Sequence, residues 1–181
     1  MWLRRKLYSL SLNYYQLFDL QPIFNIALAT LETNYRKIQS EAHPDRFVTA
    51  TSAEKLKSMQ LATLANEAYQ TLKNPANRAQ YLLELQGITA ISESNTSMPT
   101  DFLMQQMQWR ETLEDASAAK DIHTLEALLV EMQSASKSLQ ADLSQLFDEK
   151  KDYPNACETT RKLIFIDKVC ADIRKAIEHL D

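Results

Sequence analysis

The chain has 181 residues, a formal net charge of -4 at pH 7, and 45% hydrophobic residues. This composition is typical of one or two globular domains and excludes global disorder. A pI near 5.5 leaves no excess of basic residues for non-specific nucleic-acid binding. No apolar run approaches the length that crosses a bilayer. We therefore expect a soluble protein whose partners include neither nucleic acid nor a membrane.

Helical periodicity extends over most of the chain, whereas strand signals are nearly absent. Between Phe24 and Ala42, apolar residues recur at steps of three and four, which predicts a helix with one buried face. Its expected buried residues are Phe24, Leu28, Leu31, Tyr35, Ile38 and Ala42. A second helix is expected to follow an N-cap at Ser52 and to bury a stripe that ends at Leu72. Asn74-Pro75 then opens a short helix that ends at Gly87.

Three residues, His43-Pro44-Asp45, separate the first two predicted helices. Proline has a fixed φ and no N–H, and it disfavours helical geometry in the preceding residue, so the first helix must end by His43. The sequence therefore predicts a stiff polar corner that is suited to contact a partner protein. An ordinary turn with a capping aspartate is the structural alternative. A catalytic pair of His43 and Asp45 is the enzymatic alternative, but no recognisable nucleophile accompanies it.

The second half of the chain predicts a separate helical domain. A small, polar, aperiodic stretch at residues 92–97, closed by Pro99, indicates a domain boundary. Helices are expected over residues 101–118, 122–148 and 155–180, with Tyr153-Pro154 breaking the chain before the last one. A three-helix bundle buries all three apolar stripes. The predicted parts are an N-terminal extension, a first domain, a linker and a C-terminal domain, over residues 1–13, 14–87, 88–98 and 99–181.

The helix that begins at Asp101 carries two apolar faces. One face suits the core of the bundle and comprises Phe102, Trp109, Leu113 and Ala116. The other, nearly opposite, comprises Leu103, Met104 and Met107 beside Glu111. In the last helix, Phe165 lies to one side of the core stripe of Leu163, Ile166, Cys170, Ile173 and Ile177. Because a contiguous exposed apolar patch usually marks a partner site, we predict a docking surface. Packing against the first domain is the alternative.

Few residues suit cofactor chemistry. Cys157 and Cys170 are the only cysteines and form no CxxC pair, so neither a disulfide framework nor a zinc site is indicated. Gly87 is the only glycine, whereas the phosphate-binding loops of nucleotide-binding folds need several. We expect no bound metal and no cofactor.

The motifs together resemble those of a known family. His43-Pro44-Asp45 after Tyr35-Arg36-Lys37, followed by Asn66-Glu67-Ala68-Tyr69-Gln70-Thr71-Leu72, Pro75, Arg78-Ala79 and Tyr81-Leu82-Leu83, resembles a J-domain. Phe102-Leu103-Met104, Trp109-Arg110-Glu111 and residues 161–168 resemble the C-terminal domain of the HscB-type co-chaperones of iron–sulfur cluster assembly. The resemblance extends from about Tyr14 to the end of the chain.

This resemblance implies an all-α fold, in which a J-domain built on a helical hairpin precedes a C-terminal three-helix bundle. It implies a non-enzymatic, cytoplasmic bacterial co-chaperone that stimulates the ATPase of a DnaK-class, HscA-type chaperone and delivers the IscU-type scaffold protein to it. The implied chaperone-binding residues are His43, Pro44, Asp45, Arg36, Lys37 and Arg46. The implied scaffold-binding residues are Leu103, Met104, Met107, Glu111 and Phe165.

Two departures from the family pattern weaken the basic face beside the corner. Ala42 stands where an aromatic residue often precedes the motif, and Glu41 stands where a basic residue is common. Lower affinity for the chaperone, or compensation by Arg46, is expected. A J-domain protein that presents other client proteins remains the functional alternative. Because the first residues are basic and free of acidic residues, the mitochondrial matrix remains the alternative compartment.

Overall fold

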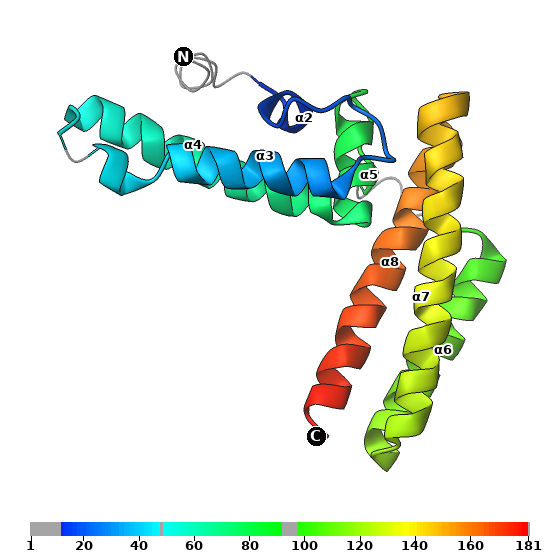
Figure 1. Cartoon of the computed structure of the whole chain (residues 1–181). Helices are drawn as coiled ribbons and strands as arrows, with labels where there is room; N and C mark the ends of the chain where they lie inside the picture. The colour runs from blue at the N-terminus through cyan, green and yellow to red at the C-terminus, as the bar shows by residue number, and fades with distance from the viewer. Residues whose placement is uncertain (1–11, 48, 92–97, 181) are drawn as a thin grey trace. The chain divides into compact units, whose positions relative to one another are not determined.

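The computed structural model describes residues 12–47, 49–91 and 98–180, which form helices and no strand. The chain divides into two compact units, Met1–Tyr81 and Leu82–Asp181. Its elements, labelled in Figure 1, are α2 (Tyr14–Leu17), α3 (Leu28–Glu41), the 3-10 helix η1 (Pro44–Phe47), α4 (Ser52–Lys73), α5 (Pro75–Glu84), α6 (Thr100–Ala119), α7 (Ile122–Ser144), the π-helix η2 (Gln145–Lys150) and α8 (Tyr153–Glu178). The predicted all-α fold class is confirmed.

In the first unit, α3 and α4 lie side by side as an antiparallel hairpin (Figure 1). Alanines at buried positions of α4, including Ala65 and Ala68, allow the two helices to approach closely. The ring of Tyr35 stacks on that of Tyr69 with centroids 4.1 Å apart. Leu28 is exposed rather than buried as predicted. It stands about 60° around the helix from Leu31, at the edge of the buried face.

The N-terminus of α4 corrects the predicted cap by one residue. Thr51, not Ser52, is the N-cap, and its hydroxyl accepts a hydrogen bond from the Glu54 amide at 3.3 Å. The Glu54 carboxylate in turn accepts from the Thr51 amide at 2.9 Å. A start at Ser52 would place Lys55 at the position where Glu54 completes a capping box, so the favourable pairing fixes the register.

Tyr81 and Arg78 hold the helices of the first unit together. The Tyr14 amide donates to the Tyr81 hydroxyl oxygen at 3.0 Å, and the two rings stack with centroids 4.3 Å apart. The buried Arg78 guanidinium donates to the Leu72 carbonyl at 2.7 Å and lies over the Phe24 ring. Two of the residues that carry the J-domain resemblance therefore stabilise the fold.

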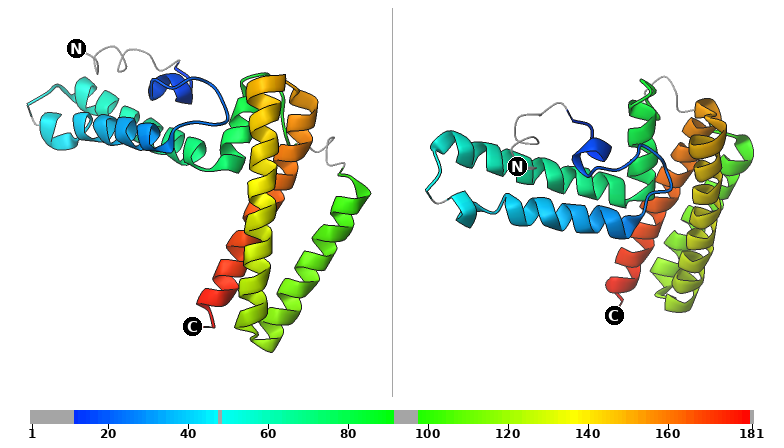
Figure 2. Two further views of the ribbon diagram at one scale, coloured as in Figure 1. Left: turned by 45° about the vertical axis from the view of Figure 1, so that its right-hand side comes forward. Right: turned by 45° about the horizontal axis from the view of Figure 1, so that its top comes forward.

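In the second unit, α7 and α8 run antiparallel along most of their length, and α6 packs against α7 (Figure 2). The buried core combines Trp109, Ala116, Leu125, Leu128, Met132, Ile166, Val169, Cys170 and Ile173. The helix predicted to end at residue 148 is α-helical to Ser144 and continues as the π-helix η2, which buries Phe147. The last helix begins at Tyr153 rather than Asn155, because Asp152 caps it and Pro154 fits its first turn.

The division between the units falls inside α5, after Tyr81. The predicted domain limits at residues 87 and 99 stay a prediction. The predicted extension and linker include residues 1–11 and 92–97, which lie outside the described residues. None of the described helices combines the length and apolar character that a membrane span requires.

Candidate functional site

The sequence His43-Pro44-Asp45 forms a corner between α3 and η1. Helix α3 ends at Glu41, and the amide of its C-cap residue Ala42 donates to the Ile38 carbonyl at 2.8 Å. Pro44 is the first residue of η1, and the Arg46 amide donates to the His43 carbonyl at 3.0 Å. The prediction that the helix ends before the proline is confirmed. The corner is a single 3-10 turn, which restricts its backbone more than an irregular loop would.

The two polar side chains of this corner are open to solvent. His43 is 60% exposed and Asp45 is 87% exposed. The Asp45 amide donates to Nδ1 of His43 at 3.3 Å. Oδ2 of Asp45 lies 3.6 Å from Nδ1, beyond hydrogen-bonding distance. The corner therefore presents an imidazole and a carboxylate to solvent, where a partner can contact both.

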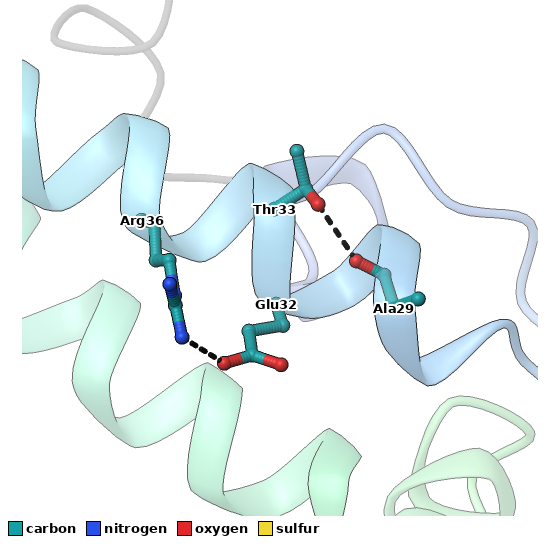
Figure 3. Close-up of polar contacts among 4 residues, drawn as sticks. All are labelled: Ala29, Glu32, Thr33 and Arg36. Atoms are coloured by element: carbon teal, nitrogen blue, oxygen red, sulfur yellow. Dashed lines mark hydrogen bonds and ion pairs between the residues drawn. The ribbon is translucent and has the colours of Figure 1, made fainter.

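The three basic residues predicted to contact the chaperone are all exposed: Arg36 and Lys37 on α3, and Arg46 in η1. Arg36 forms an ion pair with Glu32 one turn earlier, with Nη2 and Oε1 2.5 Å apart (Figure 3). A neighbouring hydroxyl, that of Thr33, donates to the Ala29 carbonyl at 2.8 Å (Figure 3). The charge of Arg36 is thus partly neutralised within α3. Arg46 belongs to the corner itself.

The second candidate surface lies on α6. Leu103, Met104 and Met107 are 44%, 63% and 71% exposed, and Glu111 is exposed beside them. On the opposite face of the helix, Trp109 and Ala116 are buried, while Phe102 and Leu113 pack against the core. The two predicted faces of this helix are therefore present. Three adjacent exposed apolar side chains form a patch that the bundle itself does not cover.

Phe165 is less open than the sequence pattern indicates. It is half-buried, with its ring edge-to-face with Phe102 at 5.9 Å and stacked on Trp109 at 6.3 Å between centroids. The Arg110 guanidinium lies over the same ring, 5.5 Å from its centroid. Phe165 therefore packs on α6 from the side of α8 and is both a core residue and a surface residue.

A groove of about 560 Å³ between α6 and α7 adds features that the sequence analysis missed. Carboxylates of Glu111, Asp115 and Glu131 line it, with Leu128 between the helices. The Trp109 indole N–H donates to Glu131 at 2.8 Å and orients this carboxylate. Glu131 belongs to α7, and the pairing of α6 with α7 is not visible from the pattern of either helix alone.

Asp121 and Cys170 have pKa values that are shifted from their ordinary values. Hydrogen bonds from the Thr124 hydroxyl and amide lower the pKa of Asp121, the N-cap of α7. Burial raises the pKa of the Cys170 thiol, against a smaller opposing effect of Arg174. Among the described residues, no three His, Cys, Asp or Glu side chains gather closely enough to hold a metal ion.

Comparisons with known proteins support the resemblance over nearly the whole chain. The family model of the HSCB C-terminal oligomerisation domain matches residues 98–174. The co-chaperone protein HscB homologue of Burkholderia thailandensis is 46% identical over 173 residues, covering 96% of this chain and 98% of the relative. The corresponding protein of Azoarcus is 42% identical over the same shares of the two chains.

Solved structures agree with the sequence relatives. The chaperone HscB from Vibrio cholerae superposes with a TM-score of 0.81 at 34% identity, over 94% of this chain and 100% of the other. The human co-chaperone protein HscB gives a TM-score of 0.84 at 27% identity, over 92% of this chain and 82% of the other. The predicted J-domain and helical C-terminal domain are therefore confirmed, and the chain belongs to the HscB family of co-chaperones.

Proposed function

We propose that this co-chaperone stimulates the ATPase of a DnaK-class, HscA-type chaperone through the corner His43-Pro44-Asp45. The proposal depends above all on one observation: His43 and Asp45 stand exposed on a single stiff turn between two packed helices. A turn with few accessible conformations loses little entropy when it binds. The chain contributes contacts, and ATP hydrolysis takes place in the chaperone.

Basic residues beside the corner support this role by attracting an acidic partner surface. Arg46 lies within the turn, and Arg36 and Lys37 lie in the last two turns of α3. Exposed charges of this kind raise the rate of association more than the affinity. Because Glu32 pairs with Arg36, we assign the larger steering contribution to Arg46.

The second part of the proposal concerns the cargo. The exposed patch of Leu103, Met104 and Met107, together with Glu111 and Phe165, binds the IscU-type scaffold protein on which iron–sulfur clusters are built. Its support is the exposure of two adaptable methionines and a leucine on one face of α6. By holding the scaffold while the other unit engages the chaperone, the chain assists the maturation of iron–sulfur proteins.

An ATPase assay with a purified HscA-type chaperone tests the first part. The unmodified chain is expected to accelerate ATP hydrolysis, whereas His43→Gln and Asp45→Asn are expected to abolish this effect. Circular dichroism and scaffold binding serve as controls for the fold of both variants. Full stimulation by either variant contradicts the role assigned to the corner.

A pull-down experiment separates the cargo from the alternative function. A tagged chain is expected to retain the scaffold protein selectively. A broad set of unfolded proteins in its place points to a J-domain protein that presents other clients. Unchanged scaffold binding after loss of the methionines points to a role for the patch within the chain itself.

The proposed compartment is the bacterial cytoplasm, because the sequence relatives at 42–46% identity are those of Burkholderia and Azoarcus. We assign no chemical reaction to the chain on its own. Turnover of a substrate in the absence of the chaperone contradicts this assignment.

A further inference from the structure

Ser58 of α4 is a buried polar residue that connects α4 to the corner. Its hydroxyl donates to the carbonyl of Ala42, sixteen residues earlier in the chain, at 2.7 Å. Ala42 is buried as well and immediately precedes His43. A buried side-chain hydrogen bond thus ends on the last carbonyl group before the corner.

The corner itself explains why this carbonyl needs a side-chain donor. In a continuous α-helix, the Ala42 carbonyl would accept from the amide of Arg46. Here the Arg46 amide donates to the His43 carbonyl at 3.0 Å, and the Asp45 amide donates to Nδ1 of His43 at 3.3 Å. Pro44 has no amide hydrogen. A buried carbonyl without a donor is destabilising, and the Ser58 hydroxyl supplies one.

We propose that Ser58 is a positioning residue for the corner and fixes the direction in which His43 and Asp45 leave α3. This inference rests on the proposed chaperone contact. Without the hydroxyl, the Ala42 carbonyl turns toward water, and the turn samples several orientations. The chaperone then binds only the competent fraction, so the apparent affinity falls by that fraction.

Titration of the chaperone ATPase with Ser58→Ala tests the proposal. The concentration of co-chaperone that gives half-maximal stimulation is expected to rise at least about threefold, because fewer molecules present a competent corner. Saturating concentrations are expected to restore the maximal rate. Amide hydrogen exchange of Arg46, followed by NMR, is expected to accelerate while the core amides of α4 remain protected.

An isosteric pair of variants separates the hydroxyl from the shape of the side chain. Ser58→Thr and Ser58→Val have nearly equal volume and differ in the hydroxyl. The threonine variant is expected to stimulate at a lower concentration than the valine variant, even if Ser58→Ala does not fold. Leu72→Val is the stability control, because Leu72 lies in the same helix about 21 Å away at 1.5 Å per residue.

Three outcomes overturn the proposal: equal titration curves for Ser58→Ala and the unmodified chain, equal curves for the threonine and valine variants, or a shift with Leu72→Val as large as that with Ser58→Ala. The first two outcomes exclude a role for the Ser58 hydroxyl. The third shows that the shift reflects a loss of overall stability and not the position of the corner. Absence of any stimulation by the unmodified chain contradicts the proposed function instead. Hydrogen exchange at Arg46 then still tests the positioning role of Ser58.

Discussion

At the scale of single residues, Arg36 and Arg46 carry the same charge in different surroundings. Glu32 pairs with Arg36, so replacing it by glutamine frees a positive charge. We expect Glu32→Gln to raise the rate of association with the chaperone by about twofold at low salt, and added salt to reduce the gain. Arg46→Gln is expected to slow association more than Arg36→Gln. Stopped-flow binding at two ionic strengths measures these rates.

The control for this prediction is Glu178→Gln. It changes the net charge equally but lies at the C-terminal end of α8, in the other unit. If Glu32→Gln and Glu178→Gln accelerate association equally, the effect is due to net charge, and Arg36 is removed from the proposed chaperone site. A flat response to salt removes all three basic residues from it.

Met104 and Phe165 belong to the same proposed surface but differ in burial. Met104→Ala is expected to weaken scaffold binding by more than about 1 kcal/mol and to leave the free energy of unfolding unchanged. Phe165→Ala is expected to weaken binding and also to lower stability by about 1–3 kcal/mol, because it removes contacts with Phe102 and Trp109. Titration calorimetry and urea denaturation measure the two quantities separately.

Val130→Ala is the matched control for the methionine. Val130 is an exposed apolar residue on α7 that lies outside the proposed surface. It is expected to leave scaffold binding unchanged. If it weakens binding as much as Met104→Ala does, the surface extends over α7. If neither variant changes binding, the patch does not bind the scaffold.

At the scale of helices, the stability of α7 is expected to depend on pH through its N-cap residue, Asp121. Its carboxylate accepts from the hydroxyl and amide of Thr124, and these bonds lower its pKa below the ordinary value of 3.8. The folded state therefore favours the charged form. Stability from this cap is fully present above pH 3.8 and is lost as pH falls through the lower, folded-state pKa. Thermal unfolding at pH 6 and pH 3 is expected to show this loss.

Asp121→Asn separates capping from titration, since asparagine also caps helices but carries no carboxylate. Its melting temperature is expected to fall less between the two pH values than that of the unmodified chain. Asp121→Ala is expected to lower the melting temperature at pH 6 already. Equal acid sensitivity of the asparagine variant and the unmodified chain contradicts the role of this carboxylate.

The sequence predicts helices well because each one carries its own apolar stripe and its own end signals. The proline of the corner determines where α3 stops, and the spacing of Leu103, Met104 and Met107 against Trp109 separates the exposed face of α6 from its core face. Features that depend on two helices are not predicted. The bond from Ser58 to Ala42 and the packing of Phe165 on α6 each need a neighbouring segment whose position cannot be read from the periodicity of one helix.

At the scale of the whole molecule, the two proposed surfaces belong to different compact units. The corner depends on packing between α3 and α4, and the cargo patch depends on the bundle of α6, α7 and α8. A substitution in one unit is therefore expected to leave the other surface intact, because sites with no shared contacts contribute additively to stability. The two proposed surfaces are carried by one continuous chain.

Because both proposed surfaces are on one chain, we predict that scaffold and co-chaperone stimulate the chaperone ATPase synergistically, which two separate chains with one surface each would not do. If one unit holds the scaffold and the other binds the chaperone, as proposed, the scaffold reaches the chaperone at a high effective concentration. With a subsaturating amount of the unmodified chain, scaffold and co-chaperone together are expected to stimulate ATP hydrolysis more than the sum of their separate effects. Met104→Ala is expected to lose only the excess, and His43→Gln all stimulation by the co-chaperone.

A mixture of these two variants provides the decisive measurement, because it contains both working surfaces on different chains. Equal amounts of His43→Gln and Met104→Ala are expected to give the stimulation of Met104→Ala alone, or less where His43→Gln sequesters the scaffold. The physical reason is that scaffold bound to one variant gains no proximity to the chaperone engaged by the other. If the mixture restores the full excess, the two surfaces act independently, and their presence on one chain has no role in delivery.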